Sequence, residues 1–340
     1  MKRYLLFASQ SYSIAILRPI QDEIRARGDD VSWYLYNVDK ELLKTEEKLL
    51  TSVKSVKQYN PVAVFAPGNW VPDFFPGIKV EVFHGFGIEK KGHFDIRGLF
   101  DLYCTHGPAT TEPFKVLQKK YGFFSVTETG WPKMDSLFTY EGNTSETREQ
   151  AVILYAPTFS PSLTSAPDLL KSITSLSQQQ NWKWIIKFHP KMPADIVEKY
   201  RSIESKNICV SNESDIIPLL HQADIILSDT SSVIAEFLCL NKPVITYKTR
   251  QPGLHVVNIS DRNALGATIE STLKKPDELM QHAKYFIQQM HPYNDGKSSE
   301  RVLNAVDDFI NANDINLKSK PLNLWRKWQV RRRLSYYHLK

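Results

Sequence analysis

The chain has 340 residues, of which 42% are hydrophobic and 24% are charged, proportions typical of globular proteins. These values exclude a disordered chain, a collagen-like fibre and a polytopic membrane protein, and three widely spaced cysteines exclude a disulfide scaffold and favour a reducing compartment. The net charge of +6 is unevenly distributed, because residues 318–340 carry eight basic and no acidic side chains. The sequence therefore predicts a near-neutral body with a basic tail.

The first part of the chain alternates short apolar runs with segments of helical period. Strands are expected at residues 4–8, 31–35, 62–65, 80–83 and 102–105, and helices near residues 11–27, 40–57 and 108–121. The basic residues 1–3 and the apolar run after them resemble a signal peptide. The run is short and breaks at residue 9, so we interpret it as a buried strand of a cytoplasmic protein.

A polar stretch at residues 140–150 is typical of a linker, and the alternation restarts after it. Strands are expected at residues 152–155, 184–188, 208–210, 225–227 and 244–247, and helices near residues 167–178, 194–205, 231–240, 276–290 and 298–311. The pattern predicts an α/β protein of two Rossmann-like, doubly wound domains, residues 1–142 and 143–312, with a basic amphipathic helix over 313–340. Ligands of such sheets bind beyond the carboxyl ends of the strands, so the active site is expected at a cleft between the domains.

A histidine and two glycines follow the fourth expected strand. The run is His84-Gly85-Phe86-Gly87-Ile88, followed by lysines at 90 and 91. The glycines allow backbone amides to approach an anion closely, and a neutral imidazole is a suitable base near pH 7. The spacing matches neither a dinucleotide fingerprint nor a P-loop, so a structural histidine in a turn is an equal alternative.

A second basic cluster emerges from a buried strand, in the run Lys187-Phe188-His189-Pro190-Lys191. Charged groups at the end of an apolar strand are costly unless they are paired or used, and a phosphate ligand would offset that cost. The alternative is a strand tip exposed to water, which is the commoner situation for any single lysine.

Small hydroxyl and acidic residues end a third strand, in the run Ser228-Asp229-Thr230-Ser231-Ser232, before an apolar helix begins. Such residues cap helices, and the same hydroxyls and amides form anion sites. Capping explains one of these residues but not four hydroxyls together, so the run favours a binding function.

Several familiar motifs are absent from the sequence. No Asp-x-Asp pair, no cysteine and histidine cluster with zinc spacing and no Gly-x-Ser-x-Gly occurs, and Gly296-Lys297-Ser298 lacks the first glycine of a P-loop. We therefore expect no metal and no cofactor, and anion binding by amides, lysine, arginine and histidine.

Taken in order, segments between about residues 80 and 302 resemble the CDP-glycerol glycerophosphotransferases of teichoic acid and capsule synthesis, of the polymerase and primase type. The matching segments are His84-Gly85 with the following lysines, Gly130-Trp131-Pro132-Lys133-Met134-Asp135, Tyr155-Ala156-Pro157-Thr158, His189-Pro190, Ser228-Asp229-Thr230-Ser231-Ser232 with Glu236-Phe237 and Asn241-Lys242-Pro243, and Asp295-Gly296-Lys297-Ser298-Ser299-Glu300-Arg301. Each piece is modest, but the ordered set is fairly specific.

The chain departs from the family pattern at three places. Phe86-Gly87-Ile88 stands where the family has Thr-Pro-Leu, Lys133-Met134 where it has Arg-Asn, and Thr230 where it has Tyr. Lysine offers a point charge where arginine offers a fork, so the phosphate geometry differs. The donor is therefore open among CDP-glycerol, which is the default, CDP-ribitol, another alditol and a nucleotide sugar.

The resemblance implies a GT-B transferase that moves an alditol phosphate from a CDP-linked donor to an acceptor hydroxyl and releases CMP. It makes His84 the general base, while His189, Lys187 and Lys133 neutralise the diphosphate. Further implied roles are phosphate binding by Ser231 and Ser232, contact with the cytidine by Pro157 and Thr158, and a hydrogen bond from Glu236 to a donor hydroxyl. The expected site comprises catalytic His84 and His189 and donor-binding Gly85, Phe86, Gly87, Ile88, Lys133, Pro157, Thr158, Lys187, Phe188, Ser231, Ser232 and Glu236.

Aromatic residues interleave with the basic residues of the tail, as in helices that lie on anionic membranes. In the family that the chain resembles, the acceptor is a membrane-associated glycan or a lipid-linked molecule. We therefore expect residues 318–340 to hold the protein at the inner face of the cell membrane. The alternative is a tail that packs on the N-terminal domain. Membrane attachment and packing are compatible if Trp325 and Trp328 pack inward and residues 331–333 are exposed. No nucleic acid partner is expected, since the body is net negative.

Two other classes of function stay open. One is a sugar transferase or nucleotide-sugar epimerase of the same architecture, although an epimerase needs carboxylates as acid and base and the loops offer mostly His, Lys and Ser. The other is a binding protein without catalysis on the same scaffold. The substitutions at Phe86, Lys133 and Thr230 favour it, whereas the presence of both His84 and His189 argues against it.

Overall fold

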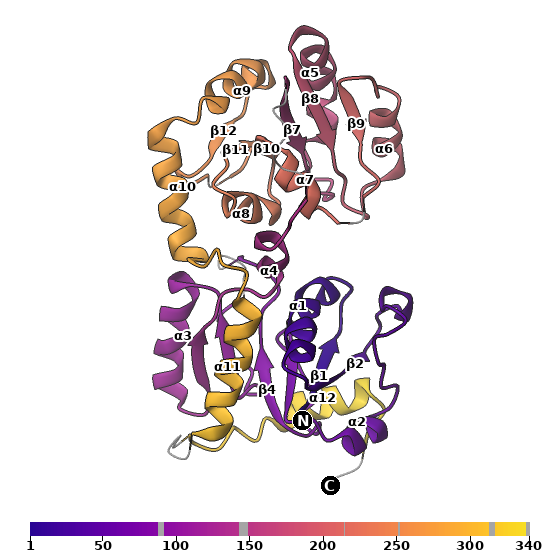
Figure 1. Ribbon diagram of the computed structural model, residues 1–340, viewed down its shortest axis with the longest axis vertical. Helices are drawn as coiled ribbons and strands as arrows, with labels where there is room; N and C mark the ends of the chain where they lie inside the picture. The colour runs from indigo at the N-terminus through magenta and orange to yellow at the C-terminus, as the bar shows by residue number, and fades with distance from the viewer. Residues whose placement is uncertain (88–91, 143–148, 214, 251, 313–316, 338–340) are drawn as a thin grey trace. The chain divides into compact units, whose positions relative to one another are not determined.

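The computed structural model describes residues 1–87, 92–142, 149–213, 215–250, 252–312 and 317–337. The chain divides into two compact units, residues 1–139 with 289–340 and residues 140–288 (Figure 1). The first unit is therefore discontinuous in sequence. Residues 289–311, which the sequence analysis assigned to the second domain, belong to the first unit. The expected linker falls partly on residues 143–148, which lie outside the described residues.

The first unit is built on a six-stranded parallel sheet in the order β2-β1-β3-β4-β5-β6. Its strands are β1 (Arg3–Ala8), β2 (Asp30–Leu35), β3 (Ala63–Ala66), β4 (Ile78–Glu81), β5 (Leu102–Thr105) and β6 (Ser125–Glu128). Its helices are α1 (Ser13–Ala26), α2 (Val53–Tyr59), α3 (Pro108–Tyr121), α4 (Lys133–Phe138), α11 (Ser298–Asn311) and α12 (Leu324–Arg333), with a short 3-10 turn at Lys40–Leu42.

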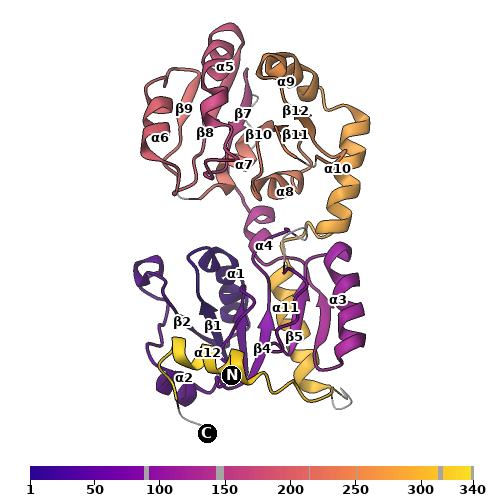
Figure 2. The same ribbon diagram turned by 180° about the vertical axis from the view of Figure 1, so that it is seen from behind.

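Helices cover both faces of this sheet, which explains why its strands β1 to β5 are mostly buried. On one face α1, α4 and α11 pack together. On the other face residues of α2, α3 and the segment after α12 join the core formed by Leu5, Phe7 and Val64. Figure 2 shows α12 crossing beside β1, β2 and α2.

The second unit has a six-stranded parallel sheet in the order β12-β11-β10-β7-β8-β9. Its strands are β7 (Ala151–Tyr155), β8 (Trp182–Ile186), β9 (Ile208–Val210), β10 (Ile225–Ser228), β11 (Val244–Tyr247) and β12 (Val257–Ile259). Its helices are α5 (Ala166–Gln179), α6 (Ala194–Arg201), α7 (Ile217–Gln222), α8 (Val233–Leu238), α9 (Leu265–Leu273) and α10 (Asp277–Met290), with a 3-10 turn at Arg262–Ala264. The two α/β sheets confirm the predicted fold class. No helix in the described part of the chain combines the length and apolar character that a membrane crossing requires.

The prediction of one helix over residues 40–57 is wrong. Only α2 at its end is an α-helix, and it begins after Ser52, whose side chain accepts a hydrogen bond from the Ser55 backbone N–H (3.0 Å). The segment before it forms the 3-10 turn at Lys40–Leu42 and then pairs with the edge of β2, where the Trp33 N–H donates to the Lys48 carbonyl (2.7 Å) and the Trp33 carbonyl accepts from the Leu50 N–H (2.8 Å). Hydrogen bonding along the open edge of β2 thus outweighs helix propensity.

Candidate active site

The second unit has a topological switch point between β7 and β10. From β7 the sheet continues to β8 and β9 on one side and to β10, β11 and β12 on the other. In open α/β sheets ligands bind beyond the carboxyl ends of the two strands at such a point. Pro157 and Thr158 follow β7, and residues 229–232 follow β10, so four of the predicted donor-binding residues lie here.

Asp229 joins the two loops at this switch point. Its buried carboxylate accepts backbone N–H groups from Thr158 (2.8 Å), Thr230 (2.7 Å) and Ser165 (2.9 Å), and a fourth hydrogen bond from the Ser165 hydroxyl (2.9 Å). Four donors satisfy a buried charge and fix the β7 loop against the β10 loop. Asp229 therefore builds the site rather than lining it, a role that the sequence analysis did not assign.

The hydroxyl residues after β10 divide into two groups. Ser228 is buried and donates to the Ala156 carbonyl (2.6 Å), so it is structural. Thr230 and Ser232 are exposed and Ser231 is half-buried. Ser232 makes no side-chain capping hydrogen bond to α8. Because α8 has only six residues, its dipole is small, and an anion here would be bound by hydroxyls and amides.

His189 lies three residues beyond the end of β8, on the side chain of Phe159 from the β7 loop. The two rings stack at 4.4 Å between centroids. Partial burial, followed by the charges of Lys191 and Lys187, lowers the pKa of His189, so the ring is neutral at pH 7. Its Nδ1 accepts the Lys191 backbone N–H (3.1 Å), which leaves the proton on Nε2. His189 is thus held as a hydrogen-bond donor.

Two predicted donor-binding residues point into the core instead. Phe188 is buried and packs edge-on against Tyr200 (5.2 Å). Glu236 is buried within α8, with 4% of its surface exposed. Beyond the end of β8 at Ile186, Phe188 packs inward, whereas Lys187 is half-buried and His189 is exposed.

A small cavity of about 250 Å³ lies at the carboxyl ends of β7, β10 and β11. Its lining includes Thr230, Lys248 and Arg250, together with Asp168, whose carboxylate pairs with Lys248 (2.7 Å). The sequence analysis missed these two cations. The signal was present, because the run Lys248-Thr249-Arg250 directly follows an apolar strand, as the basic residues after β8 do.

In the first unit, His84 stands near the carboxyl ends of β1, β3 and β4. Its Nδ1 lies 3.3 Å from the Pro67 carbonyl after β3, and its ring lies 5.6 Å from that of Tyr12 after β1. A carbonyl can only accept, so Nδ1 carries a proton, and in the neutral ring the lone pair is then on Nε2. His84 is exposed, and its Nε2 has the form that a general base requires.

The backbone just before His84 is strained. Phe83 has φ = 58°, a left-handed conformation that bulky residues rarely adopt, and so β4 ends at Glu81 rather than at Phe83 as expected. The surrounding core holds Phe83 in place, since its ring contacts His93, His106 and Phe114. Such strain persists where packing over-determines it and is concentrated at functional sites.

The loop after His84 is anchored by Phe86, which is 6% exposed. Its ring packs edge-on against Trp131 (4.9 Å), His106 (5.3 Å) and His291 (5.8 Å). Phe86 therefore positions the loop and does not face solvent, contrary to its expected role as a donor contact. Gly85 and Gly87 are half-buried, and Ile88 lies outside the described residues.

Lys133 is the first residue of α4, with its ammonium 5.4 Å from the centre of the Trp131 ring. Two residues later, the buried carboxylate of Asp135 accepts the backbone N–H groups of Ser298 and Ser299 (both 2.7 Å) at the start of α11. Gly130 is required for this junction: it has φ = 80°, and a Cβ there would lie 2.5 Å from the Ser298 hydroxyl. The two segments around Asp135 and Ser299 thus form a structural junction of the first unit.

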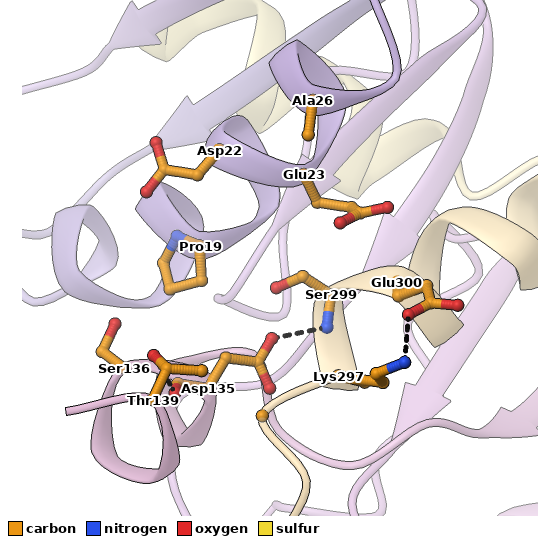
Figure 3. A pocket seen from close by; sticks show the side chains of 11 residues that line it. Pro19, Asp22, Glu23, Ala26, Asp135, Ser136, Thr139, Lys297, Ser299 and Glu300 are labelled. Atoms are coloured by element: carbon orange, nitrogen blue, oxygen red, sulfur yellow. Dashed lines mark hydrogen bonds and ion pairs between the residues drawn. The ribbon is translucent and has the colours of Figure 1, made fainter. Parts of the chain in front are cut away.

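Figure 3 shows the cavity beside this junction, between α1, α4 and the start of α11. It has a volume of about 320 Å³. Asp22, Glu23, Asp135 and Glu300 line it, with Lys297 as its one basic residue. Carboxylates repel a diphosphate. This cavity is therefore unsuited to the donor, and the basic and hydroxyl-rich edge of the second sheet is the better candidate.

The two predicted catalytic histidines have opposite tautomers. His84 presents a lone pair on Nε2, whereas His189 presents an N–H there. The first form accepts a proton and the second donates a hydrogen bond to an oxyanion. A proton acceptor and a hydrogen-bond donor suit the transfer of a group between oxygens.

Comparisons with known proteins identify relatives of this chain. The family model of CDP-glycerol:poly(glycerophosphate) glycerophosphotransferases matches residues 108–308. The teichoic acid glycerol-phosphate primase of Bacillus subtilis is 27% identical over 251 residues, which cover 66% of this chain and 65% of the primase. The teichoic acid glycerol-phosphate primase of Bacillus spizizenii is 24% identical over 203 residues, which cover 54% of this chain and 52% of that primase. The matches thus span between about half and just under two thirds of these relatives.

Solved structures share the fold at low identity. A UDP-N-acetylglucosamine 2-epimerase matches with a TM-score of 0.65 and 14% identity, covering 94% of this chain and all of that one. A variant of the wall teichoic acid polymerase TagF, soaked with CDPG, matches with a TM-score of 0.63 and 13% identity, covering 90% of this chain and 88% of that one. The family match covers more than half of the chain and confirms the resemblance seen in the sequence. The chain belongs to the CDP-glycerol:poly(glycerophosphate) glycerophosphotransferase family.

Proposed function

We propose that this protein transfers an alditol phosphate, by default glycerol phosphate, from a CDP-linked donor to a hydroxyl of a glycan or lipid-linked acceptor and releases CMP. The step belongs to the synthesis of a cell-envelope polysaccharide. The family match and the two related primases support the reaction class. The TagF structure soaked with CDPG supports a donor of this kind on the same fold.

We assign the donor to the carboxyl edge of the second sheet and the acceptor to the first unit. Pro157 and Thr158 border the cytidine, and Ser231 and Ser232 bind phosphate oxygens. The positive charge of Lys187 and the Nε2–H of His189 stabilise the diphosphate. We add Lys248 and Arg250, which lie at the same edge of the sheet and suit an anionic ligand.

The chemical step is a displacement at the phosphorus that bears the alditol. The acceptor oxygen forms a bond to this phosphorus while the bond to the bridging oxygen of CMP breaks, and the electron pair leaves with CMP. His84 accepts the hydroxyl proton on Nε2 as general base. Phosphoryl transfer depends mainly on positioning and charge stabilisation, which the Lys and His side chains and loop amides supply. Lys133 contributes a further positive charge.

The observation that most supports this proposal is the difference between the two histidines: His84 has its lone pair on Nε2, and His189 has its proton there. A glycosyltransferase or epimerase that uses a nucleotide sugar is the second candidate, because the UDP-N-acetylglucosamine 2-epimerase shares the fold. That similarity concerns the fold alone, and the loops at the sheet edges offer histidine, lysine and hydroxyl groups in the main.

The test is release of CMP from CDP-glycerol in the presence of a soluble glycan acceptor, compared with release of UDP from UDP-sugars. We expect turnover of the CDP-alditol, and we expect His84→Ala to lower kcat by about 10²- to 10⁴-fold, the usual contribution of a general base. His282→Ala, which removes a half-exposed histidine of α10, is the matched control and should keep the wild-type rate. A His84→Ala variant that retains most of its kcat would refute the base assignment.

We also propose that the protein works at the inner face of the cell membrane, held there by residues 318–340. The eight basic residues of this segment and the absence of acidic ones support attraction to anionic lipid. A membrane-associated acceptor gives this attachment a purpose.

A further inference from the structure

The basic tail is docked on the first unit by one side only. Arg331 donates to the Asp73 carboxylate (3.3 Å), and Lys320 pairs with Asp101 (2.7 Å). Val330 is buried, and the ring of Tyr336 stacks on Phe74 at 4.5 Å between centroids. These contacts fix which side of α12 faces the protein.

The outward side of α12 carries its two tryptophans. Trp325, Trp328 and Arg332 are spaced i, i+3 and i+7 and therefore share one side of the helix. Trp325 is 67% exposed and Trp328 44% exposed, and their rings stack at 5.0 Å. The alternative in which both tryptophans pack inward is therefore wrong, whereas Arg332 and Arg333 are exposed, as that alternative expected. Arg331 is half-buried because it pairs with Asp73.

Apolar exposure continues beside the tryptophans, since Leu322 is 75% and Leu324 is 70% exposed. Large apolar side chains gathered on a surface mark an interaction site. Tryptophan is suited to a membrane interface in particular, because its body is apolar and its N–H is polar.

A groove of about 500 Å³ adjoins this surface. Tyr36, Trp325, Trp328, Gln329, Arg332 and Arg333 line it, and we call it the tail groove. Among the described residues neither Arg332 nor Arg333 forms an ion pair. Their guanidinium groups lie over the rings of Trp328 (5.7 Å) and Trp70 (5.0 Å) instead. Two arginines held by aromatic rings, without a carboxylate, match the charge and shape of a phosphate group.

We propose that the tail groove binds the phosphate headgroup of an anionic phospholipid, with Trp325 and Trp328 inserted at the membrane interface. This inference rests on the proposed function in that it names the membrane partner. It differs in assigning attachment to the tail groove and the exposed tryptophans rather than to the whole charge of the tail. Charge complementarity selects the occupant, because residues 318–340 hold eight basic and no acidic residues.

The test is sedimentation of the full chain with vesicles of phosphatidylcholine alone and of phosphatidylcholine with about one third phosphatidylglycerol. We expect binding only to the anionic vesicles. Arg332→Gln with Arg333→Gln should weaken it by roughly thirtyfold, since each basic residue near an anionic surface contributes about fivefold. Trp325→Ala with Trp328→Ala should weaken it at least tenfold.

Two controls separate the groove from general charge and from misfolding. Arg331→Gln removes one charge from the docked side and is compared with Arg332→Gln alone, which removes one charge from the groove. Lys284→Ala with Tyr285→Ala removes an exposed basic and aromatic pair from α10. Arg331→Gln and the α10 variant should retain binding, whereas Arg332→Gln should weaken it about fivefold. Equal losses in Arg331→Gln and Arg332→Gln would overturn the proposal, as would absence of vesicle binding by the wild type or preference for a single-stranded oligonucleotide. CMP release with a soluble acceptor should be unchanged in the groove variants, so a failure of the transferase proposal remains distinguishable.

Discussion

His291 is deeply buried in the first unit, and its Nε2 accepts the Trp131 backbone N–H (2.9 Å). Burial lowers the pKa of His291 to about 4. The neighbouring His106 is fully buried, and burial with the nearby His291 lowers its pKa well below the usual range. Both rings stay neutral because a proton would place an uncompensated charge among the aromatic side chains around Phe86.

This burial makes the stability of the first unit depend on pH. An unfolded histidine has a pKa near 6.5, so the unfolded state binds more protons than the folded state between pH 6.5 and about 4. Stability is therefore complete above pH 6.5 and falls as the pH drops. We expect His291 alone to cost about 2 kcal/mol between pH 6.5 and 5, at about 1.4 kcal/mol per pH unit.

The measurement is urea unfolding at pH 7.5 and pH 5 for the wild type and for His291→Gln, whose amide oxygen can still accept from Trp131. The variant should lose less stability on acidification than the wild type. In the control variant His282→Ala, the free energy of unfolding should change between pH 7.5 and pH 5 by as much as in the wild type. An identical pH dependence in His291→Gln would show that His291 is not the group responsible.

At the level of elements, the proposed donor site of the second unit comprises two loops that the Asp229 carboxylate holds together. The Asp229 carboxylate accepts four hydrogen bonds through its two oxygens. In Asp229→Asn an NH₂ group replaces one of these oxygens, and it would face N–H or O–H groups that can only donate to an acceptor. We expect a loss of about 2–3 kcal/mol in stability and a loss of CMP binding greater than the loss of stability explains.

A matched variant exists at the opposite edge of the same sheet. The Asp224 carboxylate accepts the Val152 N–H (2.8 Å) near the amino ends of β7 and β10. Asp224→Asn should lose some stability but keep the affinity for CMP, measured by calorimetry beside thermal unfolding. Equal effects of the two substitutions on CMP binding would mean that the Asp229 junction does not shape a donor site.

The sequence predicted the long, strongly patterned elements and missed those that depend on their neighbours. The helix over Ser298–Asn311 and the strand Leu102–Thr105 follow from their own residues. The strand Ser125–Glu128 is half-buried throughout and contains one aliphatic residue, so only pairing with β5 makes it a strand. Likewise, the three-residue strand β12 forms because it pairs with β11. Such elements arise from tertiary contacts rather than from local pattern.

The positions of His84, His189 and Ser231 beyond the carboxyl ends of strands could be predicted from the sequence, and their roles stay predictions. The direction in which a side chain packs could not be predicted. Phe86 and Phe188 belong to the right loops, but packing turns both inward. Asp229 was part of the recognised run, and only its four hydrogen bonds reveal that it organises the loops.

For the whole molecule, the return of the chain to the first unit could not be read from the sequence. The period of Ser298–Asn311 predicts a helix but not the surface that it covers. In the structure Asp135 holds the start of this helix, and Arg27 donates to the Glu300 carbonyl (3.1 Å) and to Asn304 (2.8 Å). These contacts, more than a hundred residues apart in sequence, close the first unit around residues from both ends of the chain.

We propose that the second unit binds a CDP-linked alditol, and calorimetric titration of the full chain can decide this. The ligands are CMP, CDP-glycerol, CDP-ribitol, UDP-sugars and GDP-sugars, and the proteins are the wild type and His189→Ala. We expect selective binding of CMP and one CDP-alditol, weakened about tenfold or more in His189→Ala because the hydrogen-bond donor to the diphosphate is lost. Preference for a UDP- or GDP-sugar, or equal affinity of His189→Ala and wild type for the CDP-alditol, would contradict it.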